Sequence, residues 1–304
     1  MIVLNSLFPV FALILSGNLL KRYGLTNAIF LQTSDKLTYY IFFPLLLFWK
    51  IGGTSTALFS NSGLYKSVIC AVLIVYVLST AFILLFKISD FKVGSFSQSC
   101  YRFNSYIGVA VVLSALGEEG IQHFGILIGM IIPVINVLCV SMLIWFSGKK
   151  TLLLKRVGQI LKGLISNPLI IACISGIVYA NLAQGFPPYI DSTLQLCSFV
   201  ALPLAMLSIG AAISIGSIRD NFKLSLIASI FKLLVLPAVG YFLLLTFGVT
   251  GVALKVGLIY FALPTSPALY ILSSQLNSDT QLASAAIALS TILSFFSLSA
   301  ALLL

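Results

Sequence analysis

The chain has 304 residues, of which 60% are hydrophobic and only 8% charged, and its formal net charge is +10. Soluble domains are about a quarter charged, so this composition excludes a water-soluble core and predicts a polytopic membrane protein. The basic residues stand in short clusters between long apolar runs, without a basic aromatic motif, which argues against a nucleic-acid partner.

Ten apolar runs are long enough to cross a bilayer, whose hydrocarbon core of about 30 Å needs about 20 helical residues. We therefore expect an all-α membrane protein of ten transmembrane helices. These spans, numbered in chain order, lie near residues 2–20, 36–53, 64–86, 97–117, 121–146, 164–183, 194–215, 222–247, 252–275 and 280–303. Span 1 has no basic leader or small-residue cleavage site, so we expect a retained helix rather than a signal peptide.

The distribution of Lys and Arg predicts the orientation. Of the 17 basic residues, thirteen lie on the side reached after spans 1, 3, 5, 7 and 9, three lie on the other side, and Lys232 lies inside span 8. The positive-inside rule places the thirteen in the cytoplasm. Both termini are then expected outside a plasma membrane, and the basic segment 148–163 forms a cytoplasmic linker.

The two parts of the chain on either side of this linker are similar. A shift of 159 residues aligns Pro9 with Pro168, Gly17 with Gly176, Pro44 with Pro203 and Gln122 with Gln281, all without a gap. Residues 1–147 and 164–304 each contain five predicted spans, an odd number, so the second repeat inserts upside down relative to the first. Inverted repeats of this kind are typical of secondary transporters.

Spans 4 and 9 contain matched helix-breaking segments. In span 9, Pro264 and Pro267 remove two backbone donors and clash with preceding carbonyls, so the helix is expected to open there. At the 159-residue offset, Ser105 and Gly108 of span 4 correspond to these two prolines, and we expect span 4 to open near Gly108. Such breaks in a membrane require protein or a wet cavity around them.

A substrate site is predicted where the two broken helices cross. The half-helices that follow each break present unpaired N–H groups and a partial positive charge, which favour a carboxylate. The predicted binding residues are Asn104, Ser105, Gly108, Asn136, Pro264, Thr265, Ser266 and Pro267. Lys232, near the middle of span 8, is expected to act as a counter-charge or coupling group, because charge inside a membrane is costly. For the helix breaks, packing alone is the competing interpretation. Asn136 could instead bond a neighbouring helix, and Lys232 could snorkel to the interface or form a structural pair.

The chain resembles the auxin efflux carrier family, which includes plant PIN-FORMED proteins and bacterial malonate-type carriers. The resemblance extends over essentially the whole chain and rests on the order and spacing of several motifs. These are RFNSYIG at 102–108, NPLIIA at 167–172, ALPLAM at 201–206, LPTSPA at 263–268 and ALSTILS at 288–294.

This resemblance implies a scaffold domain from spans 1, 2, 6 and 7 and a transport domain from spans 3–5 and 8–10. It also implies crossing helices 4 and 9, transport of an organic anion by an elevator-like motion, and a homodimer. Asn104, Gly108, Pro264 and Pro267 would form the crossing, with Asn136 near it. The sequence departs from the family at Ala110, where a proline is usual, and it lacks the long hydrophilic loop of plant members, so it looks like a short prokaryotic member in an inner membrane.

Three other functions compete with this interpretation. A sodium-coupled carrier of the bile-acid type shares the inverted plan but is expected to place more carboxylates near the crossing. A channel would also use broken helices, although paired inverted halves favour alternating access. An intramembrane enzyme needs a catalytic dyad or an acidic metal site, whereas the sequence has one histidine, scattered cysteines and no predicted mid-span carboxylate, so we expect no enzyme, cofactor or metal.

Overall fold

The computed structural model describes residues 2–53, 62–146, 166–183, 185–213, 215–275 and 278–304, and these residues form helices and connecting turns without a β-strand. The all-α class predicted from composition is confirmed. The predicted linker 148–163 lies outside the described residues.

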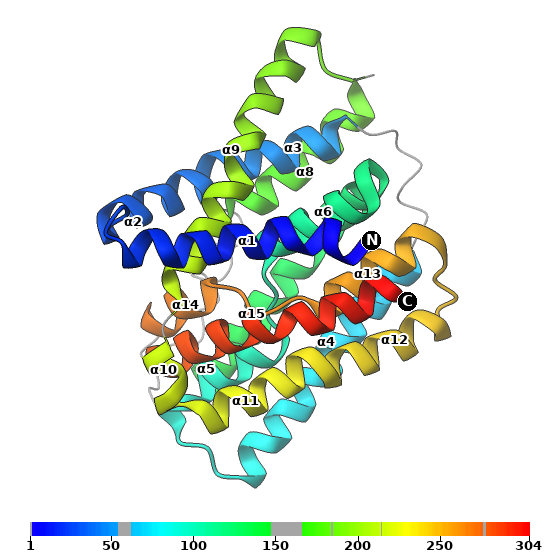
Figure 1. Ribbon diagram of the computed structural model, residues 1–304. Coiled ribbons are helices and arrows are strands. Elements are labelled where there is room, and N and C mark those ends of the chain that lie inside the picture. The colour runs from blue at the N-terminus through cyan, green and yellow to red at the C-terminus, as the bar shows by residue number, and fades with distance from the viewer. Residues whose placement is uncertain (1, 54–61, 147–165, 184, 214, 276–277) are drawn as a thin grey trace. The chain divides into compact units, whose positions relative to one another are not determined.

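The helices are shown in Figure 1. In chain order they are α1 (Ile2–Arg22), α2 (Ala28–Leu37), η1 (Thr38–Phe42), α3 (Phe43–Gly52), α4 (Ser62–Leu85), α5 (Asp90–Tyr101), α6 (Ser105–Phe146), α8 (Pro168–Leu182), α9 (Pro188–Ala212), α10 (Ile215–Asp220), α11 (Phe222–Ile230), η3 (Phe231–Val235), α12 (Leu236–Thr246), α13 (Gly251–Ala262), α14 (Ala268–Gln275) and α15 (Thr280–Leu303). The segments η1 and η3 are single π-helical turns that continue the helices on either side of them.

Six stretches among the described residues are helical, long and apolar enough to cross a membrane. They are Val3–Arg22, Ser62–Leu85, Asp90–Cys139, Pro188–Ala212, Phe222–Thr246 and Thr280–Leu303. The third has 50 residues, about 75 Å of helix at 1.5 Å per residue, which is more than twice the thickness of a bilayer core.

That long stretch is interrupted twice. Non-helical backbone separates α5 from α6, and within α6 Gly117 has φ 64° and ψ −149°, a conformation that only glycine adopts easily. Gly117 therefore ends one helix and allows the next to begin at a new angle. The other predicted spans correspond to shorter or interrupted helices, so the total of ten spans stays a prediction.

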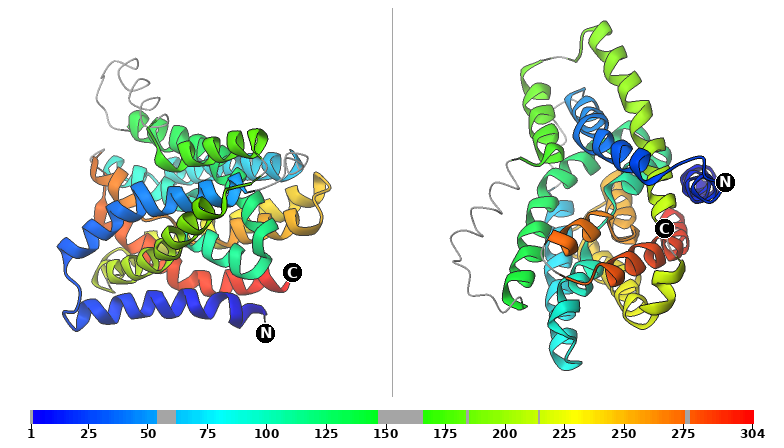
Figure 2. Two further views of the ribbon diagram at one scale, coloured as in Figure 1. Left: turned by 90° about the horizontal axis from the view of Figure 1, so that it is seen from above. Right: turned by 90° about the vertical axis from the view of Figure 1, so that its left-hand side faces the viewer.

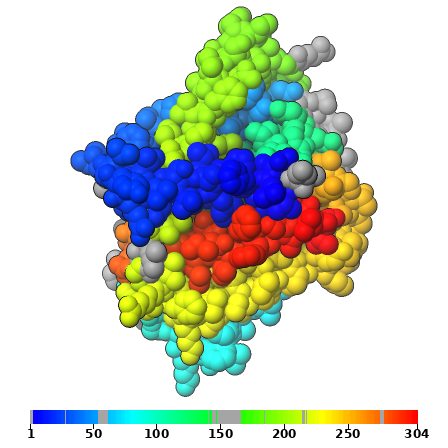
Figure 3. Space-filling view, viewed as in Figure 1, coloured from blue at the N-terminus to red at the C-terminus, as the bar shows by residue number. Residues whose placement is uncertain are grey.

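Large apolar side chains are exposed along several of these helices. On α1, Leu4, Phe8 and Leu15 are each more than half exposed, and the space-filling view in Figure 3 shows the surface of this helix in dark blue. A soluble protein does not leave helices this apolar in water, whereas lipid chains cover them without cost.

The described residues form two compact units, and each unit draws on both predicted repeats. Unit 1 comprises residues 1–62, 106–132 and 163–212. Unit 2 comprises residues 63–105, 133–162 and 213–304.

In unit 1, α1 packs along α9, and α3 packs against α8 and α9; the turned views in Figure 2 follow the α3 and α8 pair. Gly17 of α1 lies against the carbonyl of Leu207, and Gly210 of α9 lies against the carbonyl of Ile14. Small residues at matched positions allow two helix backbones to approach this closely in a membrane. Asn18 and Lys21 then donate hydrogen bonds to carbonyls at the end of α9.

In unit 2, α15 packs against α11, α13 and α5, and Figure 1 shows α15 in red alongside α11 in yellow. Helix α5 is unusual because its middle is polar and yet buried, with Ser95, Ser97, Gln98 and Ser99 all almost fully enclosed. Buried polar groups need hydrogen-bond partners. Ser95 Oγ bonds Ser273 of α14, Gln98 Oε1 accepts from Arg102, and the carbonyl of Ser99 accepts from Thr265.

Candidate functional site

Two helix breaks meet in unit 2. Helix α5 ends at Tyr101, the backbone becomes extended at Arg102, and α6 begins at Ser105. Helix α13 ends at Ala262, the backbone becomes extended at Leu263, and α14 begins at Ala268. The backbone N–H of Asn104 donates to the carbonyl of Pro264 at 2.9 Å, so the two breaks are joined directly.

The break before α14 leaves few of its polar groups without partners. The N–H of Thr265 donates to Ser290 Oγ at 3.1 Å, and its hydroxyl donates to the carbonyl of Ser99 at 2.8 Å. Ser266 Oγ accepts from the N–H of Ala268 at 3.3 Å, at the first turn of α14. Neighbouring helices therefore replace the hydrogen bonds that the prolines remove, which is the condition for a broken helix in a membrane.

The predicted opening of span 4 near Gly108 is wrong in position. The backbone leaves the helix at 102–104, and Gly108 lies inside α6 in unit 1. The physical reason is that glycine permits a break but does not force one, while Ala110 supplies no proline to disrupt the helix there. Asn104 lies within the observed break, and Ser105 starts the following helix.

The span 9 break is where the sequence predicted it. Pro264 and Thr265 lie in the non-helical segment and are buried, while Ser266 and Pro267 are partly exposed. The geometry thus gathers Asn104, Pro264 and Thr265 around one point of unit 2.

A cluster around Arg102 was not predicted, because Arg102 was one of the thirteen basic residues that the sequence analysis counted on the cytoplasmic side. Its side chain is only 9% exposed. Its Nη1 donates to Gln98 Oε1 at 3.1 Å and to Cys139 Sγ at 3.3 Å, and its Nη2 donates to Asn136 Oδ1 at 3.0 Å. Asn136 therefore accepts a hydrogen bond from the guanidinium group of Arg102, whose backbone forms part of the break.

One sequence signal could have revealed this cluster. Gln98 and Arg102 are four residues apart, the spacing at which helical side chains meet on one face. An arginine next to a helix break cannot reach bulk water as easily as one in a loop, so the positive-inside count was a poor guide at this position.

Lys232 is fully buried, in the π-helical turn η3. Its Nζ donates to the carbonyl of Phe261 at 3.1 Å, one residue before the end of α13. The C-terminal end of a helix carries a partial negative charge, so a cation here stabilises the end of the half-helix that the break creates. Ser297 caps the next carbonyl, that of Ala262, at 2.8 Å.

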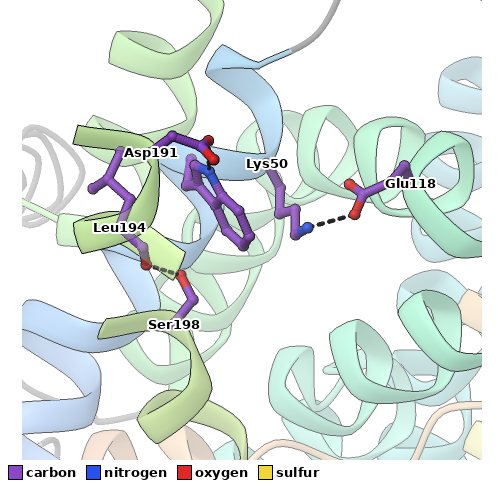
Figure 4. Close-up of polar contacts among 6 residues, drawn as sticks. Lys50, Glu118, Asp191, Leu194 and Ser198 are labelled. Carbon is purple, nitrogen blue, oxygen red and sulfur yellow. Dashed lines mark hydrogen bonds and ion pairs between the residues drawn. The ribbon is translucent and has the colours of Figure 1, made fainter. Parts of the chain in front are cut away.

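A second polar network lies in unit 1, as Figure 4 shows. Trp49 Nε1 donates to Asp191 Oδ1 at 2.6 Å, and Lys50 forms an ion pair with Glu118 at 2.5 Å. Lys50 Nζ also lies 3.8 Å from the centre of the Trp49 ring. This network connects α3, α9 and α6 and contains none of the predicted site residues.

Across the described ranges, no three His, Cys, Asp or Glu residues come together in a way that could hold a metal ion. The groups at the breaks are amides, hydroxyls, backbone carbonyls and two cations. This set of groups can bind an anion by hydrogen bonds and charge.

The comparisons with known proteins address the family. A profile described as membrane transport protein matches residues 2–302, nearly the whole chain. The chain belongs to this family. The resemblance to auxin efflux carriers is thereby confirmed, and the protein is a membrane transporter by family.

A curated relative supports the same class. The chain is 24% identical over 298 residues to the uncharacterized transporter MJ1031 of Methanocaldococcus jannaschii, covering 96% of this chain and 95% of the relative. The alignment thus covers nearly the whole of both sequences.

Proposed function

We propose that this transporter is a secondary carrier that moves a small organic anion, a carboxylate or dicarboxylate, across the plasma membrane by an elevator-type alternating-access motion. The substrate binds where the break between α5 and α6 meets the break between α13 and α14. The predicted binding residues that belong to the same unit as this point are Asn104, Ser105, Asn136, Pro264, Thr265, Ser266 and Pro267, whereas Gly108 belongs to unit 1.

The observation that carries this proposal is the hydrogen bond between Asn104 N–H and the Pro264 carbonyl. It joins two helix breaks that are far apart in the sequence, inside a chain of the membrane transport family. Discontinuous helices that meet in this way supply the substrate sites of many secondary carriers.

The charges at this point favour an anion. After the breaks, the chain resumes as helix at Ser105 and at Ala268, and helix N-termini attract negative groups. Lys232 neutralises the opposite, negative end of α13 and acts in the proposal as the counter-charge or coupling group. A cationic substrate would meet two buried basic side chains instead, Arg102 and Lys232.

Two observations support the inverted repeat on which alternating access depends. Helices α5 and α13 each have 12 residues, each precedes a break, and their first residues, Asp90 and Gly251, are 161 positions apart, close to the 159-residue offset. In addition, residues 1–62 and 163–212, which include predicted spans 1, 2, 6 and 7, group together in unit 1, along with residues 106–132 from predicted spans 4 and 5.

The proposed placement in the membrane is multi-pass, with both termini outside. Fusing alkaline phosphatase or green fluorescent protein to Leu304 tests the orientation in a bacterial host. Phosphatase activity with a dark fluorescent fusion is expected, since the phosphatase folds outside the cytoplasm and the fluorescent protein inside it. The opposite pattern refutes the orientation.

The substrate class is tested with purified protein in liposomes. Malonate, succinate and phenylacetate are offered as labelled solutes, with and without a sodium or proton gradient, and uptake is supplemented by currents on a solid-supported membrane. Labelled uptake also detects electroneutral exchange, which currents miss. We expect saturable uptake of at least one carboxylate, and the sodium dependence identifies the coupling ion.

The matched variants are Asn104→Ala and Asn181→Ala. Asn181 lies on α8, where its side chain bonds only the carbonyl one turn back on its own helix. We expect Asn104→Ala to abolish uptake and Asn181→Ala to leave it unchanged. Saturable uptake of a cation or a neutral solute, with none of any carboxylate, would refute the anion proposal.

A further inference from the structure

Arg102 carries a buried positive charge that the protein does not neutralise. All seven acidic residues of the chain lie in the described ranges, and the ion pair that the structure forms there joins Lys50 to Glu118. The three partners of Arg102 are an amide oxygen of Gln98, an amide oxygen of Asn136 and the sulfur of Cys139. An arginine held this way is oriented but keeps its full charge.

Such an arrangement is costly unless something else completes it. Burying a cation without a counter-ion is unfavourable even after hydrogen bonding, because the protein does not replace all of its hydration. Proteins tolerate this cost in a membrane mainly where the charge serves a pathway or a ligand. Glutamine, asparagine and cysteine hold the side chain at three points, which suits the positioning of a charge better than its neutralisation.

The N–H donors of the guanidinium group that these three hydrogen bonds leave over indicate what kind of group could bind there. The group has five N–H donors, and both hydrogens of Nη1 and one of Nη2 are accounted for by the three hydrogen bonds. Counting the hydrogen bonds to described residues, one hydrogen on Nε and one on Nη2 remain, and these two nitrogens lie on one edge of the guanidinium plane. A planar edge of this kind matches the two oxygens of a carboxylate.

Arg102 is also close to the crossing. It lies two residues before Asn104, whose N–H bonds the Pro264 carbonyl, so the two Cα atoms are within roughly 7 Å of each other. The arginine and the crossing hydrogen bond therefore belong to the same short non-helical segment, residues 102–104.

We propose that Arg102 is a substrate-binding residue of the carrier. Its guanidinium group binds a carboxylate of the transported solute, while Gln98, Asn136 and Cys139 hold the guanidinium in place. This inference rests on the proposed function and makes it more specific. The substrate must present a planar carboxylate, and the corresponding amide must be rejected, because an amide offers no charge and only one acceptor oxygen.

The test uses full-length transporter in liposomes and the carboxylate that the wild type takes up. Uptake is competed with each acid and its amide, for example phenylacetate against phenylacetamide and malonate against malonamide. Wild type is expected to be inhibited by the acids and not by the amides. Arg102→Gln is expected to raise KM at least tenfold and to lose this discrimination, and Arg102→Lys should lie between the two because it keeps the charge without the planar fork.

A structural role is separated from a binding role by two further measurements. Gln98→Met removes one acceptor and leaves the arginine, so its KM should rise less than that of Arg102→Gln. If Arg102→Gln does not fold, wild-type protein is treated with phenylglyoxal and Arg102 is followed by mass spectrometry. The transported carboxylate should protect Arg102 from modification, and its amide should not.

The outcomes distinguish this inference from the proposed function. Wild-type KM in Arg102→Gln, together with loss of uptake in Asn104→Ala, overturns the role of Arg102 and leaves anion transport standing. Equal modification of Arg102 with and without the carboxylate also overturns it. If wild type takes up no carboxylate at all and none protects Arg102, both proposals fall.

Discussion

Replacing Gly210 by alanine tests the packing of α1 against α9 with a defined steric change. A Cβ atom at Gly210 would lie 1.7 Å from the carbonyl oxygen of Ile14, in the backbone of the facing helix. Backbone cannot rotate away as a side chain can, so the helices must separate by roughly 1.7 Å to reach an ordinary contact of about 3.4 Å. Gly17 faces Leu207 in the same way, with a Cβ distance of 2.0 Å.

The energetic cost follows from two contributions. Overpacking of a tight contact costs about 1–3 kcal/mol. The separation also stretches the hydrogen bonds that Asn18 and Lys21 donate to the carbonyls of Gly210 and Ala211, at about 1 kcal/mol each. The total is about 3–5 kcal/mol, and at about 2–4 °C per kcal/mol the melting temperature should fall by roughly 6–20 °C.

The assay is thermal unfolding of detergent-purified protein, followed by intrinsic fluorescence. Gly53→Ala is the matched control, because Gly53 has a φ of −80° and its Cβ would meet its nearest neighbour, the carbonyl of Trp49, at 3.3 Å. The control should unfold within about 2 °C of wild type, as expected for a change of at most about 0.5 kcal/mol. If Gly210→Ala unfolds with the control, the close approach of α1 and α9 is wrong.

Three further changes have distinct expected outcomes. Lys232→Met removes the cation that caps α13 and should lower the rate of carboxylate uptake at least tenfold, which corresponds to about 1.4 kcal/mol. The control Lys255→Met, at an exposed position, should leave the uptake rate unchanged. Equal uptake rates in the two variants would show that Lys232 has no part in the mechanism. Thr265→Val leaves the buried carbonyl of Ser99 without its hydrogen-bond donor, at a cost of about 1–3 kcal/mol, so the melting temperature should drop. Thr265→Ser keeps the hydroxyl and should restore the melting temperature. Equal melting temperatures of the two variants would contradict the hydrogen bond. Glu118→Gln breaks the ion pair with Lys50. Because the Glu118 side chain is 63% exposed, the loss of folding free energy should stay below about 1 kcal/mol. A fall in melting temperature of more than about 5 °C would contradict this weak contribution.

The site could be predicted only where the covalent structure forces the backbone. Pro264 and Pro267 lack an N–H and clash with the preceding turn, so the break in span 9 was predictable to within one residue. Gly108 only permits a break, and the actual interruption occurs at 102–104. The sequence therefore located one side of the crossing well and the other side only approximately.

The environment of charged residues was predictable when the helix position alone decided it. Lys232 stands ten residues into an apolar run, so its burial followed from length. Arg102 stands near the predicted start of a span, where a solvated loop and a buried cluster look the same in the sequence. Its burial depends on Asn136 and Cys139 of α6, which are brought to it only by the fold.

The sequence by itself determined that lipid surrounds this protein, that it is helical, that a helix breaks at Pro264 and that the chain belongs to a transporter family. Each of these properties depends on composition, local backbone chemistry or the order of motifs. The tertiary structure decided which groups meet: the Asn104 N–H with the Pro264 carbonyl, Lys232 with the end of α13, and Arg102 with three neutral partners. The physical reason is that hydrogen bonds and buried charges are satisfied between helices distant in the chain, and no local pattern of residues records those pairings.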